Sequence, residues 1–320
     1  FVTKAHFPVP DLLTCSVGAT CDDFSAIAQR LESLGHPILW WEIPSRRRAE
    51  AGEAEVVLAG GFRAAVSQVE FVRHELERVR GALEELAGER LDERRLRDGI
   101  AQANRVRRIL AELRRLVFTA PACPLPALEL LIAEMMAIHF CSDRAEAILV
   151  LEELLAEVRR RVNEGTGVLG EGAARVYWVN PVADLRAMNL LEDSGGRLCG
   201  TDFLFCHALD EIPEDLPAME ALARAALADP MVGPSADRAA RIVREARGLG
   251  SEAVVISRIP GASHCATEGA VIGEAVRSEF GLPVVEIEVP PLADAMFPTL
   301  AGRLEALVET ALGNRPTRQR

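Results

Sequence analysis

The 320-residue sequence lacks the patterns that define several large classes of protein. It has no excess of basic residues, because 36 Lys and Arg stand against 48 Asp and Glu, which gives a net charge of -12. A nucleic-acid groove needs a positive surface to neutralise phosphates, so this balance argues against nucleic acid as the main ligand. No apolar run reaches the roughly 18 residues of a membrane span. The nearest candidate, 125–140, contains Glu129 and Glu134.

The amino-terminal residues also lack the charged and apolar regions of a signal peptide, so we expect a cytoplasmic protein. The chain opens at Phe1 rather than at Met, and we interpret this as an amino-terminal truncation. There is no GxxxxGK[ST] loop, which excludes a phosphate-binding loop of the ATPase type within the chain. Acid–base candidates are scarce, with six His and the single tyrosine Tyr177.

The cysteines form no recognisable pairs. Seven cysteines are present, an odd number at irregular spacing, so a disulfide framework is not expected in a cytoplasmic protein. No CxxC pair occurs, which removes support for a zinc ribbon or a thioredoxin-type site. Cysteines that share a metal would therefore have to be brought together by the fold.

The sequence does contain a strand–helix–strand pattern near its amino terminus. An apolar stretch at 10–17 is followed by the turn GATCDD, a helical segment at 25–35 that ends at Gly35, and the apolar run HPILWWEIP. This order is typical of parallel sheets. We expect residues 1–48 to be the remnant of an amino-terminal α/β domain.

Residues 49–167 have the periodicity of helices. Apolar residues recur every three or four positions over 62–86, and again over 96–117 after a break at 88–92. This pattern predicts two long amphipathic helices packed as a hairpin, followed by further helices at 126–140 and 143–163. The arginines of the second helix indicate a solvated face; they include Arg105, Arg107, Arg108, Arg114 and Arg115.

From residue 168 onwards the chain alternates between strands and helices. The glycine-rich stretch 165–172 reads as a linker, and strand patterns then alternate with helical ones to residue 312. Gly195, Gly250 and Gly281 each follow a helix and precede a strand, as helix-terminating glycines do. We therefore predict a doubly wound α/β domain at 168–320. The expected fold class is α/β, with two doubly wound parallel-sheet (Rossmann/flavodoxin-like) domains and a helical middle segment.

Two cysteines occupy the same kind of position. Cys21 lies in the turn between the first strand and helix, and Cys265 lies at the equivalent place after the strand at 252–259. Ligands of open parallel sheets bind beyond the carboxyl ends of strands, at helix amino termini. The partial positive charge there favours the thiolate, the form that binds soft metals and iron–sulfur clusters. Cys21 and Cys265 can thus face each other across a cleft between two domains.

Other interpretations of these cysteines stay open on the residues alone. Both thiols can be buried and inert, or Cys265 can be a nucleophile. His264 is not evidence for a Cys–His pair, because sequence neighbours on a loop often point apart. The remaining cysteines are expected to be core or structural residues; they are Cys15, Cys123, Cys141, Cys199 and Cys206.

Several stretches, taken in order, resemble one known family. PDLLTCSVGATCDD resembles a segment with Pro-Asp, an apolar strand and Thr-Cys-Asp, and ANRVRRILAEL resembles an Asn-x-x-Arg helix. The chain is similar to a subunit of the 2-hydroxyacyl-CoA dehydratase and benzoyl-CoA reductase family, of the D-component type. Order and spacing carry this resemblance over nearly the whole chain; the other matching stretches are RVYWVNPVADLRAMNLLEDSGGRLCGTDF, RAALADPMVG, EAVVISRIPGASHC, GLPVVEIEV and LAGRLEALVE.

The resemblance implies a four-iron, four-sulfur cluster held by three cysteines between α/β domains. Carried over by position, Cys21 and Cys265 are two of the ligands. The third lies upstream of Phe1 in the family, unless Cys15 substitutes for it. Residues beside the two ligands are candidates for the substrate pocket by proximity only; they are Ser16, Thr20, Ser263 and Glu268.

The resemblance also implies the chemistry and the partners. Low-potential electron transfer to a CoA thioester gives a ketyl radical anion, from which a 2-hydroxyl can leave, while the aryl variant reduces an aromatic ring. ATP hydrolysis then belongs to a separate iron–sulfur activator, and a homologous second subunit completes an anaerobic enzyme. The alternatives are a two-lobed α/β small-molecule binding protein without a redox role, a cysteine-nucleophile enzyme and a double-cubane-type reductase.

Overall fold

A computed structural model describes most of the chain in two compact units. One comprises residues 1–100 with 212–234, and the other comprises 101–211 with 235–320. The three ranges expected from the sequence, 1–48, 49–167 and 168–320, remain a prediction about domain organisation. The described residues are 10–19, 22–170, 172–180, 184–203, 208–259, 267–289 and 294–315.

The second unit is built on a four-stranded sheet in the order β6-β5-β7-β8. Every neighbouring pair in this sheet is parallel, which confirms the predicted α/β class. The inner strand β5 is an apolar run buried on both faces, as an inner parallel strand should be. The strands are β5 (Ala174–Val179), β6 (Gly196–Asp202), β7 (Ala253–Arg258) and β8 (Val284–Glu288).

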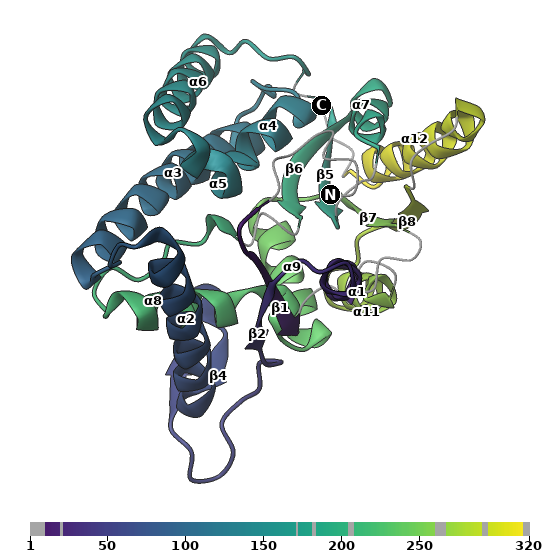
Figure 1. The fold of residues 1–320 in the computed structure, drawn as a ribbon. Coiled ribbons are helices and arrows are strands. Elements are labelled where there is room, and N and C mark those ends of the chain that lie inside the picture. Colours follow the sequence, from purple (N-terminus) through teal and green to yellow (C-terminus); the bar gives the residue numbers. More distant parts are fainter. Residues whose placement is uncertain are drawn as a thin grey trace. The chain divides into compact units, whose positions relative to one another are not determined.

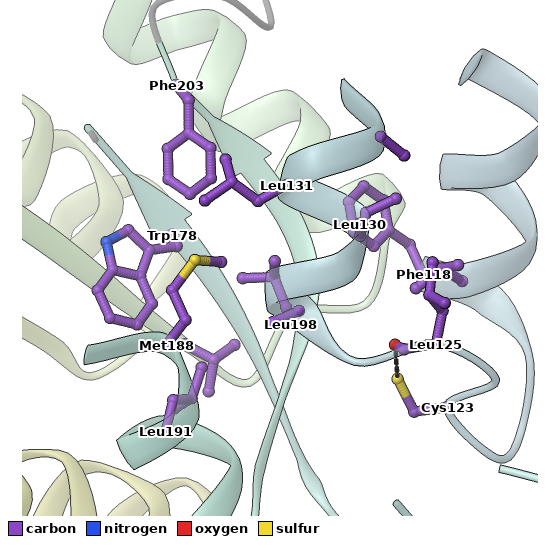
Figure 2. Packing of buried hydrophobic residues seen from close by; sticks show 14 of the residues in the cluster. Phe118, Cys123, Leu125, Leu130, Leu131, Trp178, Met188, Leu191, Leu198 and Phe203 are labelled. Carbon is purple, nitrogen blue, oxygen red and sulfur yellow. Dashed lines mark hydrogen bonds between the residues drawn. The ribbon is translucent and has the colours of Figure 1, made fainter. Parts of the chain in front are cut away.

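Helices cover both faces of this sheet (Figure 1). On one face Trp178 packs with α7 and α12, and on the other Tyr177 packs with α9 and α11. Successive side chains of a strand point to opposite faces, so this alternation makes two cores from one strand. Figure 2 shows the first core, where Met188 of α7 lies against Trp178. The helices are α7 (Arg186–Asp193), α9 (Ser235–Gly248), α11 (Gly269–Phe280) and α12 (Phe297–Gly313).

Four helices of the second unit precede the sheet in sequence. The predicted break at 88–92 lies between the two long helices, as expected. Farther along the chain, Gly195, Gly250 and Gly281 have the positive φ angles of helix-terminating glycines. The helices are α3 (Glu93–Thr119), which begins in the first unit, α4 (Ala127–Glu134), α5 (Met136–His139) and α6 (Arg144–Glu164). Short 3₁₀ turns occur at Ala59–Gly61, Phe140–Ser142, Pro230–Val232 and Asp294–Met296.

The arginines of α3 are not all on a solvated face, and this expectation was wrong for two of them. Arg114 is only 17% exposed and pairs with the fully buried Glu134 of α4. Arg107 is partly buried, and its Nε and Nη1 atoms are buried. Burial lowers the pKa of Arg107, opposed by nearby carboxylates. A 3.6-residue period places a helix face toward the core but does not say which polar residue on that face finds a buried partner.

The glycine-rich stretch after α6 is anchored to the preceding structure. The Cys123 N–H donates to the Leu169 carbonyl at 3.1 Å, and the Val168 N–H donates to the Cys123 carbonyl at 2.8 Å. A Cβ atom at Gly167 would lie 2.7 Å from the Cys123 carbonyl oxygen, so this close approach requires glycine. The segment predicted as a linker is therefore partly paired with the 121–125 turn.

The first unit contains the predicted strand–helix–strand pattern. β1 (Leu13–Gly18) and β2 (Ile38–Ile43) are parallel, and α1 (Asp22–Ser33) lies between them in sequence. The pairing aligns Leu13 with Ile38 and Gly18 with Ile43. This element order confirms the pattern expected near the amino terminus.

A β hairpin interrupts the segment that was expected to be helical. β3 (Glu55–Val57) and β4 (Arg63–Ala65) are antiparallel, so α2 (Val66–Ala87) begins only after them. The apolar face of α2 packs on α8 (Ala218–Ala228), not on α3 as the predicted hairpin of helices requires. Apolar periodicity predicted α2 and α8, but it did not predict that they pack together, because they lie more than 100 residues apart in sequence. No helix among the described residues is both long and apolar enough to cross a bilayer.

Candidate functional site

The order of strands in the second unit identifies the edge where a ligand site is expected. From β5 the chain moves outward to β6, and it then returns to β7 on the other side of β5. The carboxyl ends of β5 and β7 therefore flank the point where the sheet reverses direction, which is the usual place for ligands in open α/β sheets. Residues 260–266, which include Cys265, connect β7 to α11 in the sequence.

Both predicted cluster ligands lie outside the described residues. Cys21 falls between β1 and α1, and Cys265 falls between β7 and α11, so both positions follow a strand and precede a helix as expected. Thr20, Ser263, His264 and Cys206 also lie outside the described residues. The prediction that Cys21 and Cys265 share one cluster therefore stays a prediction.

A buried arginine lies at the carboxyl edge of the sheet. Arg238 comes from the first turn of α9 and is fully buried. Its Nε and Nη2 atoms donate to Asp202 Oδ2 at 2.8 and 2.6 Å, and Nη2 also donates to Asn180 Oδ1 at 2.7 Å. Its Nη1 atom donates to Glu268 Oε2 at 2.6 Å. All three guanidinium nitrogens are therefore used.

The partners of Arg238 stand at the ends of different elements. Asp202 is the last residue of β6, Asn180 follows the last residue of β5, and Glu268 directly precedes α11. The Asn180 side chain also donates from Nδ2 to the Ser257 carbonyl of β7 at 3.0 Å. One guanidinium thus connects three strands and the start of a helix.

Asn180 has a backbone conformation that few residues other than glycine adopt. Its φ angle is +66°, and its side chain is fully buried. The Ser257 hydroxyl donates to the carbonyls of Val179 and Asn180, and it accepts from the indole N–H of Trp178 at 3.0 Å. The side chains of Asn180 and Ser257 are therefore hydrogen bonded, as a buried polar network requires.

The electrostatics of this network keep Arg238 charged. Burial alone lowers the pKa of Arg238, but the neighbouring carboxylates of Asp202 and Glu268 outweigh it and hold that pKa above its ordinary value. Asp202 is 3% exposed and Glu268 is 14% exposed at the side chain. A buried cation with two carboxylates forms a compact ionic group whose parts depend on one another.

Two further polar contacts lie near the end of β6. Arg114 of α3 donates to the Thr201 hydroxyl at 2.7 Å while it pairs with Glu134. The Tyr177 hydroxyl donates to Glu245 Oε2 at 2.9 Å. Burial raises the pKa of Tyr177 well above its ordinary value. The single tyrosine is therefore a packed core residue and not an acid–base group near neutral pH.

A cavity of about 570 Å³ opens beside the edge strand β8. It lies next to the carboxyl ends of β7 and β8 and the first turns of α12, and its lining includes Arg258, Glu288, Met296 and Arg303. Arg258 pairs with Glu288 and lies 3.5 Å from Glu286. The charges of this lining largely balance, so the cavity does not by itself select for an anionic ligand.

Three of the described cysteines are buried thiols. Burial raises the pKa of Cys15 and Cys123, and it raises the pKa of Cys199 to about 11. The Cys123 thiol donates to the Leu125 carbonyl at 3.2 Å, the dashed contact in Figure 2. The assignment of Cys123 and Cys199 to the structural core is confirmed by their burial, whereas Cys141 is exposed.

Cys15, the candidate substitute ligand, is buried. In the protein without a metal, the raised pKa of Cys15 favours the neutral thiol, and its role as a substitute ligand stays a prediction. Of the residues expected near the ligands, Ser16 lies in β1 and Glu268 is taken up by its ion pair with Arg238. Within the described ranges, no three His, Cys, Asp or Glu side chains gather in a way that could hold a metal.

The residues that surround Arg238 were not predicted from the sequence. A signal for them was present, because Asn180 and Asp202 each stand at the end of an apolar strand and Arg238 lies four residues before Ile242 on the apolar face of α9. A lone arginine on an apolar helix face requires buried partners. The identity of those partners depends on strand order, which the residues do not state.

The fold and this edge define a doubly wound α/β protein whose ligand site is expected at the strand reversal between β5 and β7. The chain matches the family described as 2-hydroxyglutaryl-CoA dehydratase, D-component, over residues 1–311. It therefore belongs to that family, which confirms the resemblance seen in its sequence. A D-component is one component of a dehydratase, so the family implies a partner subunit. Among curated proteins, no sequence matches the chain significantly.

Proposed function

We propose that this chain is the iron–sulfur component of a radical 2-hydroxyacyl-CoA dehydratase. The observation that supports this most is the family match, which spans both Cys21 and Cys265, taken with the position of Cys265. The connection that carries Cys265 leaves β7 at the strand reversal and ends at the amino terminus of α11. Dehydration is preferred over aryl-ring reduction because the matched family is described as a dehydratase.

The donor chemistry around Cys265 suits a four-iron, four-sulfur cluster. The first backbone N–H groups of α11 and its dipole favour an anion at this end of the helix, so they favour a thiolate at Cys265. Cys21 also directly precedes a helix, α1, but Asp22 and Asp23 in the first turn of that helix oppose the effect of its dipole on the thiol. Cys21 and Cys265 would be two of the cysteines that hold the cluster. When bound, such a cluster supplies low-potential single electrons for a CoA thioester.

The chain's own residues would shape and electrically balance this edge. In the second unit, Arg238 of α9 is hydrogen bonded to Asp202 at the end of β6 and to Glu268, which directly precedes α11 at one flank of the connection that carries Cys265. A fully paired network is rigid, which keeps the ends of the connection in place while charge changes nearby. Tyr177 is buried and paired, so we do not expect it to move a proton in the reaction.

The electron needs an energetic source outside this chain. No GxxxxGK[ST] loop occurs in the sequence, so ATP hydrolysis would belong to a separate iron–sulfur activator protein. A homologous second subunit would complete the enzyme.

The proposal is tested by iron analysis of the protein purified without oxygen. We expect a brown protein with about four iron atoms per chain. Cys21→Ser and Cys265→Ser should each lose most of the iron, while Cys141→Ser, at an exposed position in the described structure, should keep it. A colourless protein, or equal iron in all variants, would overturn the proposal and favour a binding protein without a redox role.

Activity would then separate the two reactions. With activator, ATP and partner subunit present, we expect loss of water from a 2-hydroxyacyl-CoA and no reduction of an aryl-CoA. The reverse result would assign the chain to ring reduction. Loss of activity on thiol alkylation in a protein without iron would point instead to a cysteine nucleophile.

A further inference from the structure

The connection that carries Cys265 begins and ends beside the same buried side chain. Its first flank is the end of β7, where the Ser257 carbonyl accepts from Asn180 Nδ2 at 3.0 Å and Asn180 Oδ1 accepts from Arg238 at 2.7 Å. Its second flank is Glu268, whose carboxylate accepts from Arg238 Nη1 at 2.6 Å. Arg238 therefore reaches both flanks of residues 260–266, one of them through Asn180.

This link is anchored to the sheet and not only to the two flanks. Asp202 accepts two hydrogen bonds from Arg238 at the end of β6, and its backbone carbonyl accepts from the Asn180 N–H at 3.0 Å. Arg238 itself belongs to α9, which packs against the same face of the sheet as α11. The guanidinium thus lies at the junction of three strand ends and two helices.

Because Arg238 and two of its hydrogen-bond partners are buried, their side chains are held in fixed positions. Arg238 is fully shielded from solvent, and Asp202 and Asn180 are buried with it. In such surroundings an ionic hydrogen bond cannot be exchanged for one to water at low cost, so each partner is held in place. Arginine suits this position because its planar fork offers several donors in fixed directions, which a lysine ammonium does not.

We propose that Arg238 is a positioning residue that fixes both flanks of the β7–α11 connection, at Ser257 through Asn180 and at Glu268 directly. Glu268 connects Arg238 to the start of α11, and Asn180 connects Arg238 to the end of β7. The function of this tether rests on the proposed cluster role of Cys265, but the tether itself is a property of the protein without iron. The two can therefore be tested separately.

The first experiment uses iron-free protein and hydrogen exchange. Glu268→Ala removes one arm at a partly accessible position, and Glu274→Ala, on the exposed face of the same helix, is the matched control. We expect amide exchange at Ile272, whose N–H donates to the Glu268 carbonyl at 3.0 Å, to be about 10 to 100 times faster in Glu268→Ala than in the wild type. Glu274→Ala should exchange like the wild type. Equal exchange in the two variants overturns the inference.

A conservative variant distinguishes a tether from a general packing role. Glu268→Gln keeps an oxygen that can accept from Arg238, so it should restore most of the protection lost in Glu268→Ala. A Gln variant that behaves like the Ala variant would overturn the tether, because the acceptor would then not be what matters. Arg238→Met alone would leave the carboxylate of Asp202 buried without its cation, so this change is combined with Asp202→Asn. In the double variant we expect faster amide exchange at the end of β7 and at the start of α11.

The second experiment tests the effect on the cluster. In iron-loaded protein we expect the electron paramagnetic resonance signal of the reduced cluster to change in Glu268→Ala and to return toward the wild-type signal in Glu268→Gln. Glu274→Ala should leave it unchanged. An unaltered signal in Glu268→Ala overturns the positioning role. If no variant, nor the wild type, takes up iron, the proposed function fails while the exchange result still decides the tether.

Discussion

Arginine supplies almost all the positive charge of this chain, since Lys4 is the only lysine among its 36 basic residues. Several of these arginines are used inside the fold. Arg197 donates to the carbonyls of Val117, Ala120 and Pro121 at 2.6 to 2.9 Å and is 2% exposed. Arg46 donates to the carbonyls at the end of α8 and lies 4.0 Å over the ring of Phe62. A guanidinium can satisfy several buried carbonyls at once.

Replacing Arg197 with methionine should lower the free energy of unfolding by about 3 kcal/mol, because it leaves buried carbonyls at the end of α3 without a donor. The matched control is Arg105→Met, which removes an exposed arginine with an ion pair to Glu152. That change should cost less than about 0.5 kcal/mol. Urea unfolding followed by circular dichroism measures both. Equal losses would show that the buried contacts of Arg197 do not stabilise the fold.

The buried thiol of Cys199 predicts a loss of stability in alkali. Its pKa is raised from 9.0 in the unfolded chain to about 11 by burial. The unfolded state loses this proton first as the pH rises, so the contribution is fully present below about pH 9 and is lost as the pH approaches about 11. We expect the free energy of unfolding to fall by on the order of 2 kcal/mol more in the wild type than in Cys199→Ala over this range.

The alkaline comparison is favourable because the other cysteines titrate equally in the wild type and in Cys199→Ala, and few groups of other kinds titrate there. The chain has one lysine and one tyrosine, and the pKa of Tyr177 lies well above its ordinary value. The measurement is a series of urea unfolding curves from pH 8 to pH 11, and the slopes of stability against pH are compared, not the absolute values. Parallel slopes in the wild type and Cys199→Ala would contradict the prediction.

At the scale of elements, the junction between β1 and α1 depends on one glycine. Gly18 ends β1 with a φ angle of +100°, and a Cβ atom there would lie 2.3 Å from the Ile43 carbonyl oxygen. That carbonyl accepts from the Ala19 N–H at 2.8 Å, which holds the end of β1 to the end of β2. The conformation of Gly18 and this hydrogen bond therefore fix the end of β1 against the end of β2.

Gly18→Ala should therefore destabilise the protein by about 3 kcal/mol, from backbone strain and from the clash with β2. Gly35→Ala is the control at the other end of α1, since Gly35 has a φ angle of +87° but no atom within 4 Å of the position that a Cβ would take. It should cost only about 1 kcal/mol, the strain alone. Thermal unfolding measures the two. Similar losses of stability in the two variants would show that the Ile43 carbonyl can move away from the new Cβ atom without a further loss of free energy.

At the scale of the whole molecule, the proposal assigns one cluster ligand to each compact unit. Cys21 belongs to the unit of residues 1–100 with 212–234, and Cys265 belongs to the unit of 101–211 with 235–320. A ligand that binds only the folded protein stabilises every part that must be folded to hold it. A cluster bound through both cysteines is thus linked to the folding of both units.

Removing iron with a chelator should consequently lower the unfolding temperature of both units, by several degrees. Differential scanning calorimetry without oxygen, on protein before and after chelation, provides the measurement, and Cys141→Ser is the control that should behave like the wild type. An unfolding profile that does not change when iron leaves would contradict the linkage. A shift confined to one unit would remove either Cys21 or Cys265 from the ligand set.

The sequence by itself determined the elements and the family. Apolar period and turn residues located β1, β5, β7, β8 and the helices between them within a few residues, because period and turn chemistry are local properties. The order of its stretches also identified the family, which the match over residues 1–311 confirmed. The hairpin β3–β4 escaped notice because its strands are three residues long and precede a strong helix pattern.

Only the tertiary structure decided how those elements are combined. The strand order β6-β5-β7-β8 brings Asn180, Asp202 and Ser257 to one edge, and it links Arg238 to both ends of the connection that carries Cys265. Within the first unit, α8 packs on α2, which lies more than 100 residues before it in the sequence. These pairings depend on which surfaces meet in three dimensions, and such long-range contacts leave no periodic trace along the chain.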